Sequence, residues 1–224
     1  MIMEKILVVA PHPDDETLGA GATIFKHSKD GDEIYWCIVT KPYTPDWNKE
    51  FISKRKKEIT EVGQLYGFKK IFELGLPTVK LDLMGQKKVN DALAQVIKEI
   101  KPNIVYAPHP GDLNCDHKIV FNAVMVALRP SRDWEIKKIL CYETLSETEW
   151  GGYSVGRAFL PNYYVNAKPT FDLKMKAMQF YASEIDPPPH PRSLEVIKAN
   201  AIKRGSECGL LMAEAFHSIR IVER

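Results

Sequence analysis

Short apolar runs and longer amphipathic stretches alternate along the chain up to Glu143. The apolar runs are short enough to be buried strands and lie at residues 4–10, 33–40, 70–74, 103–107 and 137–143. The stretches between them repeat apolar residues at helical spacing and lie at residues 15–29, 49–66, 86–100 and 116–128. Strands that alternate with helices of this length predict βαβ units joined by right-handed crossovers. We therefore expect an α/β fold with a Rossmann-like, mostly parallel sheet flanked by helices.

The alternation ends after Glu143. Residues 144–164 are rich in glycine, tyrosine and tryptophan, which predicts a loop with a short strand of its own. This loop is either a lid that contacts a sugar or a packed surface segment. Helices are expected at about 170–182 and 193–206, and the tail at 213–222 is expected to pack back onto the fold. We expect one domain over residues 1–224, with a small irregular C-terminal part.

A polar cluster directly follows the first predicted strand. The sequence PHPDDE at residues 11–16 brings one imidazole and three carboxylates to the carboxyl end of that strand. In open α/β sheets this end is where ligands bind. Closely packed carboxylates are stabilised by a positive charge between them, and a divalent metal supplies one. The competing interpretation is that the acids only cap the following helix.

A second cluster follows the fourth predicted strand. Residues 107–117 read APHPGDLNCDH and repeat the pattern of an apolar strand, a proline break and a polar helix start. If the two strands are neighbours in a parallel sheet, both clusters face one crevice. Zinc is commonly held by three His and Asp or Glu ligands with a fourth position open. His12, one carboxylate of the first cluster and His117 would supply such a set, for zinc or another divalent metal.

These segments resemble those of the PIG-L/LmbE-like N-acetylglucosaminyl deacetylases. The likeness covers most of the chain. It rests on PHPDDE at 11–16, RKKE at 55–58, the segment 109–117, HPRSLE at 190–195, RG at 204–205 and AEAF at 213–216. It implies an LmbE-like fold and a hydrolase that removes the acetyl group from an N-acetylglucosamine-type sugar or sugar conjugate.

The resemblance also implies roles for individual residues. His12, Asp15 and His117 would hold Zn²⁺, and Asp14 would be the general base that takes a proton from a zinc-bound water. Arg55, Asp112 and Asn114 are expected to contact the substrate. From spacing alone, Arg55 could equally form a surface ion pair with Glu58.

One position departs from the family. Many members carry a histidine three places before the last metal histidine, and this chain has Asn114 there. An amide cannot carry the positive charge of an imidazolium. The sequence therefore leaves a second hypothesis open, a catalytically weak or silent relative that binds a sugar or nucleotide sugar, or that serves an assembly.

Composition excludes several other classes of protein. The formal charge of +2 is too small to indicate a nucleic-acid partner. The four cysteines lie far apart without a Cys-x-x-Cys pair, which excludes a zinc finger and suits a reducing compartment. No apolar stretch is long enough to span a bilayer, so we expect a cytoplasmic protein. Gly19 and Gly21 fall inside the first predicted helix, so the dinucleotide-binding fingerprint is absent. A small sugar substrate is the expected partner, and a homo-oligomer is left open.

Overall fold

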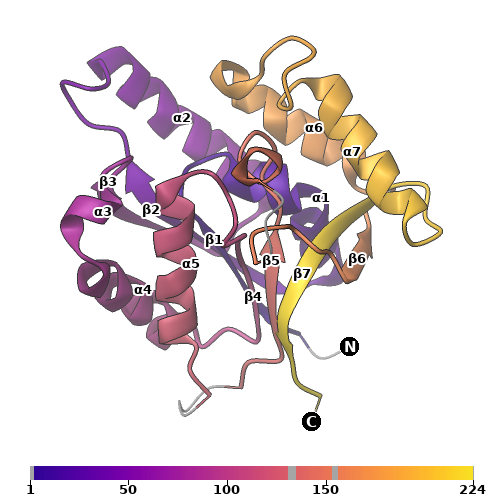
Figure 1. Cartoon of the computed structure of the whole chain (residues 1–224), viewed down its shortest axis with the longest axis horizontal. Helices are drawn as coiled ribbons and strands as arrows, with labels where there is room; N and C mark the ends of the chain where they lie inside the picture. The colour runs from indigo at the N-terminus through magenta and orange to yellow at the C-terminus, as the bar shows by residue number, and fades with distance from the viewer. Residues whose placement is uncertain (1–2, 131–134, 153–155, 224) are drawn as a thin grey trace.

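The computed structural model describes residues 3–130, 135–152 and 156–223. Within them, seven strands form one sheet in the order β3-β2-β1-β4-β5-β7-β6 (Figure 1). The strands are β1 (Lys5–Ala10), β2 (Glu33–Lys41), β3 (Lys70–Pro77), β4 (Ile104–Pro108), β5 (Lys138–Tyr142), β6 (Tyr163–Asn166) and β7 (Ala213–Ile221). The first five strands pair with one another in parallel, which confirms the predicted α/β fold class.

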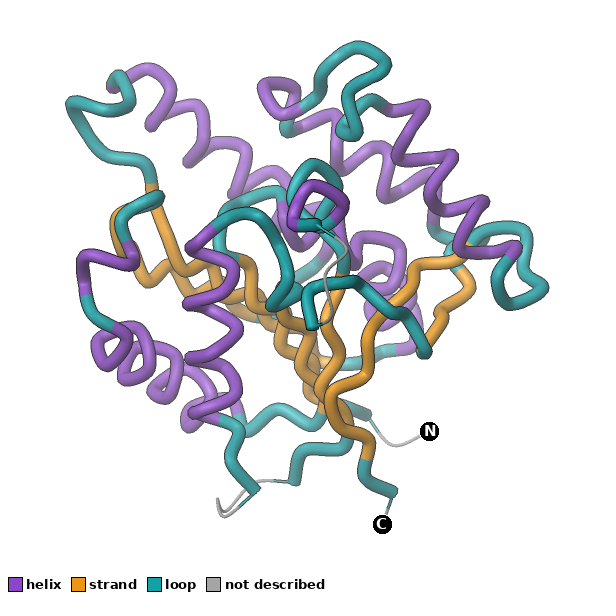
Figure 2. The backbone as a smooth tube through the Cα atoms, viewed as in Figure 1, coloured by secondary structure: helices purple, strands orange, loops and turns teal. Residues whose placement is uncertain are grey.

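Helices cover both faces of the sheet (Figure 2). They are α1 (Asp15–Asp30), α2 (Lys49–Tyr66), α3 (Leu81–Met84), α4 (Gln86–Ile100), α5 (Cys115–Ala127), α6 (Phe171–Phe180) and α7 (Leu194–Ser206), with 3-10 turns at Glu149–Gly151 and Ala182–Glu184. Alternate residues of β1 point to opposite faces, as the pleat of a strand requires. Ile6 and Val8 therefore join the core under α1, α2, α6 and α7, whereas Leu7 and Val9 join the core under α4 and α5.

The helix ends agree with their sequence signals. The side chain of Asn48 caps α2 by accepting a hydrogen bond of 2.7 Å from the backbone N–H of Phe51. The same helix ends at Gly67, which has a left-handed φ of 73° and is the residue expected at that position.

The C-terminal part is more regular than the sequence pattern predicts. Residues 213–221 were expected only to pack back onto the fold, but they form β7 in the interior of the sheet. This strand runs antiparallel to both β5 and β6. The structure also adds the short helix α3 and extends β3 to Pro77.

The sheet reverses its order of strands between β1 and β4. These two strands are paired neighbours, with Ile6 opposite Ile104. The helix after β1 packs on one face and the helix after β4 on the other, so their connections diverge and leave a crevice at the carboxyl ends. Both polar clusters of the sequence lie at this point.

A buried ion pair joins three elements that carry this crevice. Both carboxylate oxygens of Glu214 in β7 accept backbone hydrogen bonds from α1, at 3.0 Å from Ala22 and 2.7 Å from Thr23. Lys174 of α6 lies 2.7 Å from Glu214 and donates to the Leu18 carbonyl at 2.8 Å. The pair therefore fixes α1 against α6 and β7.

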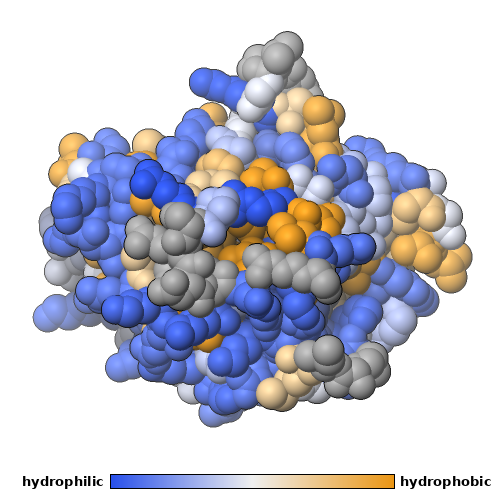
Figure 3. Space-filling view, turned by 90° about the horizontal axis from the view of Figure 1, so that it is seen from below, coloured by the Kyte–Doolittle hydropathy of each residue, from blue (hydrophilic) through white to orange (hydrophobic). Residues whose placement is uncertain are grey.

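No helix in the described part of the chain combines the length and the apolar character needed to cross a bilayer. The face seen from below, near the two chain ends, is mainly hydrophilic around a small hydrophobic patch (Figure 3).

We expect Lys174→Met to lower the free energy of unfolding by about 3–5 kcal/mol, because it leaves the buried carboxylate of Glu214 without its cation. Lys57→Met is the matched control, since Lys57 is 76% exposed and lies 3.7 Å from Glu61. The control should change stability by less than about 1 kcal/mol. Urea unfolding of both variants measures the difference, and equal losses would contradict a stabilising role for the buried pair.

Candidate metal centre

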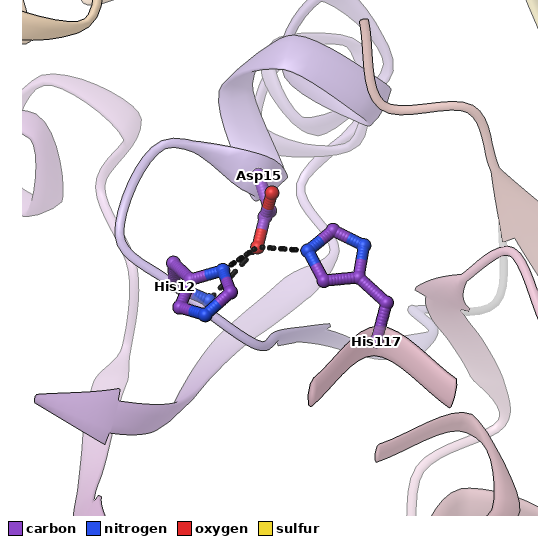
Figure 4. Close-up of side chains that lie close together, drawn as sticks. All are labelled: His12, Asp15 and His117. Atoms are coloured by element: carbon purple, nitrogen blue, oxygen red, sulfur yellow. Dashed lines mark hydrogen bonds and ion pairs between the residues drawn. The ribbon is translucent and has the colours of Figure 1, made fainter. Parts of the chain in front are cut away.

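Three side chains from the two polar clusters point toward one another at the crevice (Figure 4). His12 lies in the loop after β1, Asp15 is the first residue of α1, and His117 lies in the first turn of α5. The Oδ2 atom of Asp15 is 3.3 Å from Nδ1 of His12 and 3.4 Å from Nε2 of His117. The structure thus brings together the three residues that were predicted as metal ligands.

The geometry and the unpaired atoms of this group fit a zinc ion. Two ligand atoms bound tetrahedrally to zinc at about 2.0–2.1 Å are separated by about 3.3 Å, which is close to both distances from Asp15. Nε2 of His117 and Oδ1 of Asp15 are buried and have no hydrogen-bond partner. Burying a polar atom without a partner is costly, and a bound cation would remove that cost.

Each histidine is held by a further carboxylate. Nδ1 of His117 lies 2.7 Å from Asp112, whose other oxygen accepts a hydrogen bond of 2.6 Å from the hydroxyl of Thr148. Nε2 of His12 lies 3.1 Å from Asp116. Such contacts fix the tautomer and the ring orientation of a ligating histidine.

This position corrects the expectation for Asp112, which was a contact with the substrate. Asp112 is fully buried behind His117, and both of its oxygens are bonded to protein atoms. It does not line the cleft described below. The sequence placed the residue near the centre but could not show on which side of the imidazole it lies.

The electrostatics of the group favour a cation at its centre. Burial disfavours the charged imidazole, but hydrogen bonds to Asp116 and Asp15 outweigh it and raise the pKa of His12 to about 9. Burial likewise opposes protonation of His117, yet the charge of Asp15 and the bond to Asp112 hold its pKa well above the usual value. Burial alone would raise the pKa of Asp15, but the two histidines lower it far below its ordinary range. The same carboxylates would stabilise a divalent ion in place of the protons on the two imidazoles.

Asp14 has a backbone conformation that separates it from Asp15. Its φ is 124°, which is rare for a residue with a Cβ atom and is typical of functional sites. Its carbonyl accepts hydrogen bonds from Thr17 and Leu18, and its N–H donates to Glu16 at 3.0 Å. These bonds hold the strained residue in place, and its side chain lines the cleft while Asp15 faces the histidines.

The carboxyl group of Asp14 is buried and contacts an arginine. Its Oδ2 lies 2.9 Å from Nη1 of Arg192. Burial raises the pKa of Asp14 to about 8, against the opposing charge of Arg192 and with a further rise from Asp15. A carboxyl group with a pKa near neutrality can both accept and release a proton at physiological pH.

Glu16 has a structural position. Its oxygens accept hydrogen bonds from the backbone N–H of Asp14 and from the hydroxyls of Thr17 and Tyr181. Burial raises its pKa to about 7. The three acids of the first cluster therefore point to three different places, namely the cleft, the metal centre and the core.

A cleft of about 210 Å³ opens at the candidate metal centre, where His12 is the ligand that lines it. Its wall includes the aromatic rings of Trp47 and Phe51 and the side chain of Asn114. Oδ1 of Asn114 caps α5 by accepting a hydrogen bond of 3.0 Å from the N–H of Asp116. Asn114 thus lies in the cleft as expected, but it also has a structural role that the sequence did not reveal.

Arg55 lines the cleft and also pairs with Glu58, and this ion pair is buried rather than on the surface. Its side chain is buried and lines the cleft, where one guanidinium nitrogen pairs with Glu184. The other nitrogen lies 3.2 Å from Glu58, three residues further along α2. A bond of 3.4 Å to the Pro13 carbonyl connects it to the first polar cluster.

Sequence reasoning did not assign three charged residues to the site. Arg192, Glu184 and Glu147 all line the cleft. Arg192 belongs to the HPRSLE segment, so its place in the family pattern was a usable signal. Glu147 and Glu184 lie in irregular segments without a recognisable pattern, and only the tertiary structure brings them to the site.

The first part of the 144–164 loop packs against the site, with Thr144, Ser146 and Thr148 buried. Thr148 supports Asp112, and Glu147 reaches the cleft. A Cβ atom on Gly151 would lie 2.1 Å from the Gly111 carbonyl, so the two backbones are in close contact. Residues 153–155 of the expected lid lie outside the described residues.

Comparisons with known proteins show that the chain is similar to deacetylases. The chain is 23% identical over 192 residues to a probable N-acetyl-alpha-D-glucosaminyl L-malate deacetylase 2 of Bacillus subtilis, covering 82% of this chain and 84% of the relative. It is 26% identical over 194 residues to a diacetylchitobiose deacetylase of Thermococcus kodakarensis, covering 81% and 70%. A crystal structure of a conserved protein from Thermus thermophilus matches with a TM-score of 0.79 and 26% identity, over 99% of this chain and 97% of that chain.

The family model described as PIG-L, GlcNAc-PI de-N-acetylase, matches residues 7–128. This region carries both polar clusters, and the fold beyond it agrees with the solved relative along nearly its whole length. The chain belongs to the PIG-L family of deacetylases.

Proposed function

We propose that this protein is a zinc-dependent N-deacetylase that removes the acetyl group from an N-acetylglucosamine-type sugar or sugar conjugate. The observation that carries the proposal is the buried, unpaired Nε2 of His117 beside Asp15 and His12, at the edge of a cleft that also holds Asp14. The deacetylase relatives support the reaction class.

The residues of the candidate metal centre have different roles in this proposal. His12, Asp15 and His117 would hold the metal, which when bound lowers the pKa of a water molecule and polarises an acyl carbonyl. Asp112 and Asp116 orient the two imidazoles from behind. Asp14 takes the proton from the attacking water and passes it to the leaving amine.

Arg192 positions the proposed base. Its Nη1 is bonded to Asp14, and its Nε lies 2.7 Å from the hydroxyl of Ser146. The arginine is thus fixed at two points and holds the carboxyl of Asp14 in the cleft. Asn114 presents a neutral amide where many relatives have an imidazole, so stabilisation of the oxyanion depends more heavily on the metal.

The alternative is a silent relative that binds a sugar without hydrolysing it. The presence of all proposed ligands and of Asp14 favours the enzyme. Acetate release over a panel of N-acetylglucosamine conjugates, with zinc supplied, separates the two. A protein that binds zinc and a conjugate but releases no acetate from any member would support the silent relative.

The metal ligands are tested by zinc titration. We expect the wild type to bind about one zinc per chain, His117→Ala to lose it, and Asp112→Asn to bind it about 10–100-fold more weakly because the imidazole is less well oriented. Asp91→Asn is the matched control, since Asp91 is 59% exposed and pairs with Lys87. Full occupancy in His117→Ala would remove His117 from the ligand set.

The base is tested by separating turnover from metal content. Asp14→Asn keeps the shape of the side chain but cannot accept a proton. We expect it to retain zinc and to lose about 10²–10⁴ in turnover. Near-normal acetate release would assign Asp14 a structural role instead.

Asn114 is tested by two substitutions that differ in capping ability. Asn114→Ala should lower stability by about 0.5–2 kcal/mol through loss of the α5 cap, whereas Asn114→Ser should preserve the cap. We expect both to reduce turnover only moderately, because the amide is neutral. Urea unfolding and acetate release measure the two effects, and a loss as deep as that of Asp14→Asn would place Asn114 at the reacting carbonyl.

A further inference from the structure

One carboxylate lies between the two arginines of the cleft. Oε2 of Glu184 is 3.0 Å from Nη1 of Arg192, and Oε1 pairs with Nη2 of Arg55. Both oxygens of Glu184 are therefore used on guanidinium groups. An anionic part of a substrate would need these guanidinium groups to bind, since arginine binds carboxylate and phosphate with its paired N–H donors.

Other acids also neutralise the positive charge of Arg55 and Arg192. Arg55 also lies 3.2 Å from Glu58, and Arg192 lies 2.9 Å from Asp14 and 3.9 Å from Glu147. Lys54, whose side chain is half exposed, lies 3.9 Å from Glu58. Among the described residues of this cluster, three cations thus face four acids. Even with Asp14 and Glu58 protonated, Glu184 and Glu147 still balance both arginines.

Because the arginines are buried, their ion pairs with these acids are strong. The side chains of Arg55 and Arg192 are only 7% and 15% exposed, so water screens the cluster weakly. The proposed metal adds two positive charges, and the carboxylates of Asp15, Asp112 and Asp116 lie around it and more than match them. An anion that enters the cleft must either displace Glu184 or accept repulsion from it, and like charges brought together without solvent are strongly unfavourable.

The rest of the wall suits an uncharged ligand. Trp47 and Phe51 contribute aromatic side chains to the lining of the cleft. Aromatic rings combine apolar contact area with a well-defined geometry, and a few polar groups among them are typical of small-molecule sites. Lys41, Lys49 and Lys56 line an adjoining groove beyond Arg55, but all three are exposed and act through water.

We propose that the cleft selects N-acetylated sugars whose aglycone is uncharged, such as a second neutral sugar, and that Glu184 is the residue that rejects anionic conjugates. The inference rests on the proposed deacetylase function and adds the chemical class of the group attached to the sugar. Specificity of this kind comes from a repulsive element as well as from attractive contacts.

The test compares two conjugates that share the acetylated sugar. The kcat/KM for acetate release is measured for neutral N,N'-diacetylchitobiose and for the anionic N-acetylglucosaminyl malate. We expect the wild type to favour the neutral substrate by at least about tenfold. Glu184→Gln should reduce that preference by at least about tenfold, equivalent to about 1.4 kcal/mol, because it frees guanidinium charge for the malate.

Glu207→Gln is the matched control. Glu207 accepts hydrogen bonds of 2.9 and 3.1 Å from Arg204 but lies outside the cleft. This variant should keep the wild-type ratio. Thermal unfolding of each variant confirms that the ratios are compared between folded proteins.

The outcomes are distinct. A wild type that prefers the malate conjugate would overturn the inference and leave the deacetylase function intact. An unchanged ratio in folded Glu184→Gln would remove Glu184 as the selecting residue. Failure to release acetate from either conjugate would count against the proposed function. In that case calorimetric binding of the two deacetylated products decides the inference, since tighter binding of the anionic product would overturn it.

Discussion

The pairing of β1 with β4 is the constraint on which the candidate site depends. Each strand ends in a polar cluster that by itself looks like the start of a capped helix. Parallel pairing places both carboxyl ends at the same edge, and the helices that follow leave on opposite faces. The distance between Asp15 and His117, which are far apart in the chain, is set by this pairing. A shift in register would move the histidine away from the carboxylate.

Neighbouring acids acquire different properties because their surroundings differ. Asp15 lies between two imidazoles, which lower its pKa, whereas burial dominates at Asp14 and raises its pKa to about 8. The positive φ of Asp14 makes this separation possible, since it turns the backbone between two adjacent carboxylates. Hydrogen bonds from Thr17 and Leu18 to its carbonyl, and from its N–H to Glu16, stabilise that strained conformation.

The C-terminal part supports the site from a distance. β7 carries Glu214 to the middle of α1, and α6 brings Lys174 to the same place. The segment that precedes α7 contributes Arg192, which contacts the proposed base. The cleft is therefore assembled from segments near both ends of the chain, although the family model matches only residues 7–128.

The sequence by itself determined the order of strands and helices up to β5 except for the short helix α3, because apolar periodicity and helix-terminating residues such as Gly67 are local signals. It also pointed to His12, His117 and one carboxylate of the first cluster, which the family resemblance narrowed to Asp15, and the structure brings these three together. Only the tertiary structure decided that β7 enters the sheet, that Asp112 lies behind His117, and that Glu184 joins Arg55 to Arg192. These features depend on which distant segments meet. Strand order and side-chain direction are settled by packing over the whole core, which no local pattern records.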